Sequence, residues 1–169
     1  MKQERLSIGD VGMALAMALE PLAPLKRLSE FTCRSIGEVH NAERRLRAAR
    51  LLRPDSRSVE REPLLRFIQW GVPHAYPPTL GAMAVGVATA QLLSMNGEPA
   101  EAEFVWPTAS GTTRGQAFAP PYPRASRLVD ANPQLRRLLS LVDLVRIGGA
   151  RDQVAAIAEI ERIAFAPAL

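Results

Sequence analysis

The stretch SIGEVHNAERRLRAARLLRP, residues 35–54, combines a regular apolar pattern with a high density of arginine. Ser35 begins it and Glu38 follows at the spacing of a helix capping box. The apolar residues after Ser35 recur at helical spacing, which predicts one long amphipathic helix over residues 35–50. These residues are Ile36, Val39, Ala42, Leu46 and Ala49.

Shorter elements flank this helix on both sides. A helix is predicted from Ser7 to Glu20, because apolar residues recur at helical spacing and Pro21 ends the pattern. Pro24 opens a second, shorter helix that includes residues 26–31. After the long helix, Pro54-Asp55-Ser56 favours a turn, so residues 51–53 and 57–60 are expected to form a small hairpin. A further helix is expected over residues 64–70, closed by Gly71.

Positive charge is concentrated rather than spread over the chain. The whole sequence of 169 residues has a net charge of +4, and residues 34–53 alone carry six arginines against two glutamates. A focused basic stripe attracts polyanions through counterion release. A solvated helix face is the alternative interpretation.

Three helices followed by a small hairpin, with the third helix long and rich in arginine, is the element order of a winged helix-turn-helix domain. In such a domain the third helix enters the major groove of double-stranded DNA with its N-terminal half at the bases. The residues expected near bases are Ser35, His40, Asn41 and Arg44, and those expected near phosphates are Arg45, Arg47, Arg53 and Arg57.

Residues 35–54 also resemble the recognition helix and the start of the wing in MarR-like winged-helix regulators. The resemblance covers about a third of the chain and implies a DNA-binding transcriptional regulator. The whole layout shows a weaker similarity to abortive-infection antitoxins, which join a winged helix to a second domain and act beside nucleotidyltransferase-like toxins. The matching positions of the MarR-like resemblance are Ser35, Val39, Ala42, Leu46, Ala49, Leu51 and Leu52.

The second half of the chain has a different character, and we place a domain boundary near residue 72. Residues 72–100 are rich in proline and glycine, and within them residues 82–93 are compatible with a buried helix or an irregular loop. Residues 101–106 and 112–118 predict two strands of a hairpin. Helices are predicted over residues 133–147 and 151–165, joined by Gly148-Gly149.

The motifs of common enzyme classes are missing from the sequence, including phosphate-binding glycine loops, zinc-protease helices and nucleophile elbows. Two histidines cannot build a His-rich metal site, so neither a metal nor another cofactor is expected. Cys33 has no partner for an internal disulfide and is expected to pack between the second and third helices. The chain lacks an apolar run long enough to span a bilayer and a secretory signal, so we expect a cytoplasmic protein.

Together these features predict an α+β protein that is not an enzyme. A winged helix over residues 1–71 would be followed by a smaller domain, residues 72–169, with a β-hairpin and a C-terminal helical pair. We expect a DNA-binding homodimer that associates through its apolar C-terminal helices. The alternative is an interaction protein, such as the antitoxin partner of a toxin enzyme. Asp143 is an isolated charge on an apolar helix, and its partner could be Arg146, Arg151 or a residue of a second subunit.

Overall fold

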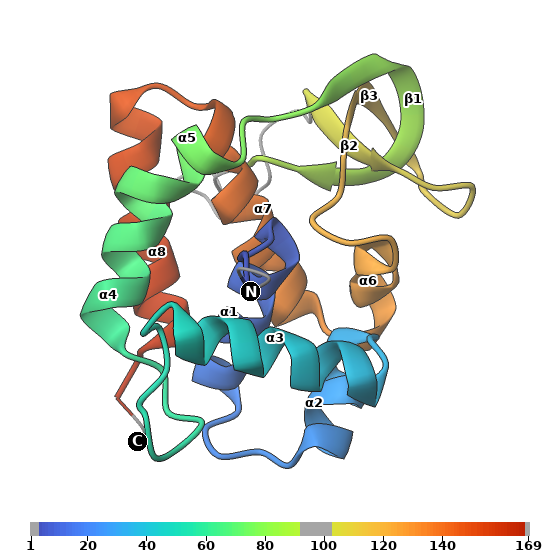
Figure 1. Cartoon of the computed structure of the whole chain (residues 1–169). Helices are drawn as coiled ribbons and strands as arrows, with labels where there is room; N and C mark the ends of the chain where they lie inside the picture. The colour runs from blue at the N-terminus through green and yellow to red at the C-terminus, as the bar shows by residue number, and fades with distance from the viewer. Residues whose placement is uncertain (1–3, 92–102, 168–169) are drawn as a thin grey trace.

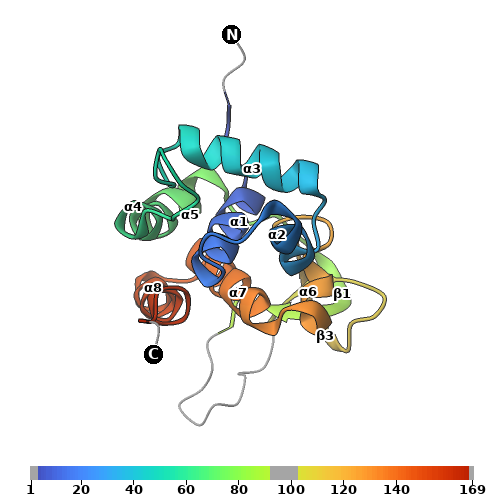
Figure 2. The ribbon, with the colours of Figure 1, turned by 90° about the horizontal axis from the view of Figure 1, so that it is seen from below.

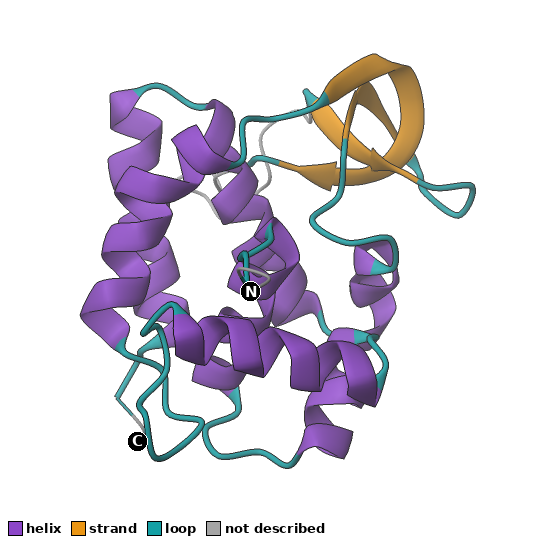
Figure 3. Ribbon diagram, viewed as in Figure 1, coloured by secondary structure: helices purple, strands orange, loops and turns teal. Residues whose placement is uncertain are grey.

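The computed structural model describes residues 4–91 and 103–167, and it has an α+β architecture (Figure 1). Helices make up most of the chain up to residue 75, a three-stranded mixed sheet follows, and a helical pair ends the chain. The strands gather at one corner of the molecule, beside the helices (Figure 3).

The three N-terminal helices form where the sequence predicts them: α1 (Ile8–Leu19), α2 (Leu25–Thr32) and α3 (Ile36–Ala48). Every residue from Gly9 to Met17 is buried, so α1 is the central helix of this group. A helix that is buried on all sides requires neighbours all round. These include α3 on one side and α7 on another (Figure 2).

The predicted hairpin after α3 is small. It contains one β-bridge, between Leu52 and Val59. The amide of Arg53 donates to the carbonyl of Ser58, and the amide of Glu60 donates to that of Leu51, both over 2.9 Å.

The next helix does not end at Gly71. It runs as α4 (Arg61–Arg66), a π-helical turn (Phe67–Gly71) and α5 (Val72–Ala75). A β-carbon at Gly71 would lie 2.6 Å from the ring of Phe67, so glycine permits the wide turn to pack instead of stopping the helix.

The sheet corrects two predictions. β1 (Leu80–Thr89) is a strand, where the sequence pattern favoured a helix or an irregular loop; residues 92 and 93 of that prediction lie outside the described residues. β2 (Phe104–Pro107) and β3 (Thr113–Phe118) are strands as predicted, although residues 101 and 102 of the first prediction lie outside the described residues. The two strands do not form an antiparallel hairpin. Each pairs antiparallel with β1, and they pair parallel with each other, which closes a small barrel.

Close backbone contacts explain the closed sheet. Gly86 of β1 pairs with Pro107 on β2 and with Thr113 on β3. A β-carbon at Gly86 would lie 2.0 Å from the carbonyl oxygen of Trp106, and one at Gly111 would lie 2.3 Å from the backbone of Gly86. Only glycine allows this approach, so β1 can bend between its two partners.

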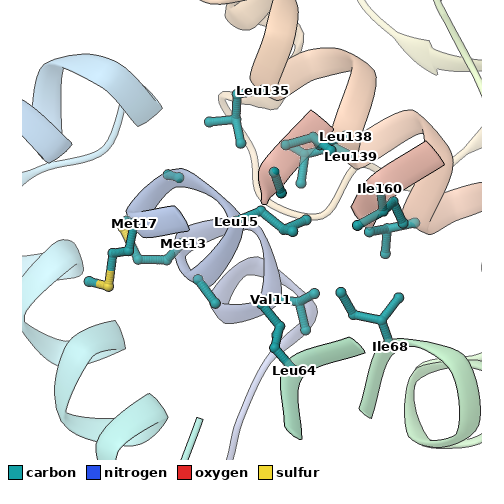
Figure 4. Close-up of a cluster of buried hydrophobic side chains, with 14 of the residues drawn as sticks. Val11, Met13, Leu15, Met17, Leu64, Ile68, Leu135, Leu138, Leu139 and Ile160 are labelled. Atoms are coloured by element: carbon teal, nitrogen blue, oxygen red, sulfur yellow. The ribbon is translucent and has the colours of Figure 1, made fainter. Parts of the chain in front are cut away.

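The C-terminal helices are confirmed as α7 (Pro133–Ile147) and α8 (Ala150–Ala164), preceded by a 3-10 turn (Ala125–Arg127) and α6 (Leu128–Ala131). The N-cap of α7 is Asn132, whose side chain accepts from the Leu135 amide over 3.0 Å. Leucines of α7 meet α1 and Ile160 of α8 in the core (Figure 4). The apolar face of α7 is therefore covered within the chain, which removes the reason for expecting α7 at a dimer interface.

A buried aspartate joins the barrel to the helices. Asp143 of α7 accepts from the Thr89 hydroxyl and the Trp106 indole over 2.7 Å, and from Arg146 over 2.9 Å. Arg146 is thus the partner that the sequence left open, and it also donates to the carbonyl of Tyr76 over 2.8 Å. Burial raises the pKa of Asp143 to about 6, although Arg146 and the other donors oppose that shift.

Candidate nucleic-acid interface

One face of α3 is covered by the protein and the other is open. Val39, Ala42 and Leu46 are fully buried against the neighbouring helices. We call the opposite side the outer face of α3; α3 lies at the edge of the helical group (Figure 2). A β-carbon at Gly37 would have no neighbour within 4 Å, so this face is unobstructed there. The outer face consists of the exposed residues Ser35, Ile36, Gly37, His40, Asn41, Arg44 and Ala48.

The N-terminus of α3 is held by the predicted capping box. The Ser35 hydroxyl accepts from the Glu38 amide over 3.2 Å, and the Glu38 carboxylate accepts from the Ser35 amide over 2.7 Å. Arg124, from the segment before the 3-10 turn, also pairs with Glu38. Hydrogen bonds from Ser35, above all from its amide, and then from Arg124 lower the pKa of Glu38 to about 2. Glu38 is therefore ionised at neutral pH, and Arg124 balances its charge.

Left-handed backbone connects α2 to α3. Cys33 has a φ of 55° at the C-cap of α2, a conformation more often taken by glycine. The turn Thr32-Cys33-Arg34 contains no glycine, and the half-buried Cys33 takes this conformation while packing against the core.

Arg45, expected near phosphate, instead binds within the protein. Its guanidinium donates two hydrogen bonds to the carboxylate of Asp10, over 2.8 and 2.7 Å. Asp10 lies on α1 and is fully buried. The pair fixes the orientation of α3 on α1, because a bidentate arginine–carboxylate contact is strongly directional.

Arg47 and Arg57, also expected near phosphates, hold the hairpin. One nitrogen of Arg47 donates to the carbonyls of Arg53, Pro54 and Ser56, at 2.7, 2.8 and 3.1 Å. Both arginines also bind Glu43, Arg47 over 2.8 Å and Arg57 over 2.9 Å. Burial by itself raises the pKa of Glu43, but hydrogen bonds from Arg57 and Arg47 give a net lowering.

Other arginines keep their charge at the surface. Arg44 pairs with Glu4 over 3.0 Å but its side chain is 57% exposed. Arg53, at the hairpin, is 63% exposed and 3.7 Å from Glu60. Arg50 is exposed just beyond α3, with no ion-pair partner among the described residues. The structure thus brings Ser35, His40, Asn41 and Arg44 together on one face and places Arg53 at the hairpin beyond the helix.

Sequence reasoning missed Arg50 and Gly37 as parts of this surface. Arg50 is one of the six arginines in residues 34–53. Its position just after the last helical residue could have indicated that its side chain is exposed. The importance of Gly37 depends on its open surroundings, which only the folded chain shows.

Comparison of the chain with protein-family models, with curated proteins and with solved structures finds no match. Among the described residues there is no cluster of potential metal ligands. Within the same part of the chain, no helix has the length and apolar content required to cross a membrane.

Proposed function

We propose that the protein is a DNA-binding transcriptional regulator whose residues 1–71 act as a winged helix, as the MarR-like resemblance implies. The observation that carries the proposal is the outer face of α3. Apart from the exposed Ile36, it presents small and polar groups without obstruction, while the opposite face packs on the neighbouring helices. A recognition helix requires this division between a packed face and an open face.

The proposed DNA contacts are assigned to the side chains that are exposed to solvent. His40 and Asn41 project from the exposed half of α3 that would meet base edges, with Arg44 one turn further along. Arg50 and Arg53 would reach phosphates at the far end of the helix and at the hairpin, which serves as the wing. Arg45, Arg47 and Arg57 support the interface through internal contacts instead of binding DNA.

The test is fluorescence-polarisation binding to a duplex from the region upstream of the gene, compared with a scrambled duplex across a salt series. Asn41→Ala should lower specific affinity roughly 10-fold, because a side-chain contact to a base is worth about 1–3 kcal/mol. Arg53→Ala should weaken both duplexes and reduce the salt slope by about 1.

The matched control is Arg66→Ala, which removes the same charge from α4, where Arg66 pairs with Glu62. Its affinity for both duplexes should be close to that of the wild type, apart from a small decrease caused by the loss of one positive charge. Wild-type affinity in Asn41→Ala and in Arg44→Ala would rule out α3 as the recognition helix.

A homodimer would place two copies of α3 in successive major grooves, about 34 Å apart. Light scattering of the purified chain, alone and with the duplex, measures the number of copies. Two symmetry-related copies would bind a palindromic DNA site. If light scattering finds one copy per duplex, a palindromic site is not expected.

The second candidate is an interaction protein, such as an antitoxin that binds a nucleotidyltransferase-like toxin. It is favoured by apolar side chains on the outside of β1: Leu80, Met83 and Val85 are 41%, 60% and 51% exposed. Co-purification with the product of an adjacent gene, and its loss in Met83→Asp, would support this candidate. Exposed apolar patches of this kind are typical of contact surfaces.

A further inference from the structure

A polar cleft lies between the barrel and the segment that leads into α7, on the side of the molecule where Figure 1 shows the barrel above α6. Its volume is about 670 Å³, within the range of small-molecule sites. The loop between β2 and β3 contributes Thr108, Ser110 and Thr112 to the lining, and the hydroxyls of Thr108 and Ser110 hydrogen-bond to each other over 3.2 Å. Ser126, Arg127 and Arg136 also contribute to the lining.

Neither arginine of this cleft has an ion-pair partner among the described residues, although the carboxylate of Asp130 also lines the cleft. Arg136 is half-buried and donates to the Ala88 carbonyl over 3.2 Å, but no carboxylate of the described chain lies within 4 Å of it. Arg127 is exposed and has no ion-pair partner in the same part of the chain. Burial, and then the charge of Arg137, lowers the pKa of Arg136. A desolvated cation of this kind favours an anionic partner.

The chemistry of the lining narrows the ligand class. Two guanidinium groups and several hydroxyls supply many hydrogen-bond donors, and the planar fork of arginine matches phosphate oxygens. Asp130 is the one carboxylate among the residues that line the cleft, and it can accept hydrogen bonds from ligand hydroxyls. We propose that the cleft binds the phosphomonoester of a small polyhydroxy compound, with the phosphate at Arg127 and Arg136.

The segment that carries Arg127 and leads into α7, the helix of Arg136, is held in place before any ligand binds. The Tyr122 hydroxyl donates to the Thr32 carbonyl over 2.9 Å, and the Asn132 amide donates to the Phe31 carbonyl over 3.2 Å. These bonds attach the two ends of the segment to α2. A preformed segment reduces the entropy lost on binding.

The experiment follows backbone amides and arginine Nε–H groups of the full chain by NMR during titration with ribose 5-phosphate. We expect saturable shifts in the loop between β2 and β3 and at Arg136, with a Kd on the order of 1 mM or tighter. Ribose at the same concentrations is the uncharged control and should cause no saturable shift. Inorganic phosphate should compete.

Arg127→Gln and Arg136→Gln should each weaken binding roughly 10-fold, and Arg66→Gln should leave it unchanged. Arg127 is exposed, so its variant keeps the test valid if Arg136→Gln proves unstable. Shifts confined to α3, equal binding of ribose, or no saturation would overturn the proposal. Because the readout uses no DNA, failure of this inference is distinguishable from failure of DNA binding.

Discussion

Helix α3 and the barrel are each attached to the rest of the chain by the same kind of contact, a buried aspartate bound to an arginine. Asp10 on α1 holds Arg45 of α3, and Asp143 on α7 holds Arg146 together with groups from the barrel. The two pairs differ in their exposure. The Arg45 side chain keeps 22% of its surface exposed, whereas that of Arg146 keeps 5%.

The number of attached elements also differs. The Asp10 pair connects two helices, while Asp143 connects α7 with β1 through Thr89 and with β2 through Trp106. Arg146 adds the backbone between α5 and β1 through Tyr76. Asp143 therefore joins two strands of the barrel to α7, whereas Asp10 joins α3 to α1 through a pair that water can partly reach.

The largest expected effect is on the contacts of Asp143. Asp143→Ala leaves the buried charge of Arg146 without its partner, so the free energy of unfolding should fall by about 3–5 kcal/mol. Urea denaturation followed by circular dichroism measures it. Asp130→Ala, an exposed aspartate on α6, is the control and should stay within about 0.5 kcal/mol. Equal free energies of unfolding for the two variants would show that Asp143 does not hold the barrel more firmly than an exposed aspartate would.

The stability of the protein should also depend on pH through Asp143. The pKa of Asp143 is about 6 in the folded chain, above its ordinary value of 3.8, so the folded state binds a proton that the unfolded state releases between these values. The stability of the wild type relative to Asp143→Asn should therefore be highest below about pH 4 and decrease as the pH rises through about 6. Urea titrations at several pH values test this, and a difference independent of pH would contradict it.

Local signals in the sequence were sufficient for the N-terminal helices and the C-terminal pair. The cap of α3 at Ser35 and that of α7 at Asn132 depend on residues within one turn, so both could be predicted. The outward direction of His40 and Asn41 also follows from helical periodicity alone.

The barrel and the arginine pairings could not be predicted in this way. β1 consists largely of small residues, and its pairing with residues 104–118 is long-range. The partner of Arg45 lies 35 positions earlier in the chain. A local charge count therefore treats Arg44 and Arg45 alike, although one is exposed and the other is bound to Asp10.

This difference between neighbouring arginines gives the next prediction. Arg45→Ala should lower the free energy of unfolding by roughly 2–3 kcal/mol, less than a fully enclosed pair, because water reaches part of the site. Arg44→Ala should change stability by less than about 0.5 kcal/mol, since its pair with Glu4 is exposed. Urea denaturation of both variants measures the contrast, and similar losses in the two would mean that the Asp10 pair does not anchor α3.

The smallest effect concerns the start of α3. Ser35→Ala removes the side-chain cap and should cost about 1 kcal/mol, and Ser35→Asp should recover most of it because aspartate also caps helices. The pKa of Glu38 is about 2, lowered first by the Ser35 amide and then by the Ser35 side chain, so loss of the side chain alone should raise that pKa only in part. NMR titration of the Glu38 carboxyl measures this shift. A stability loss with an unchanged Glu38 pKa would place the role of Ser35 outside the capping box and leave the Arg124 contact as the main restraint on this end of the helix.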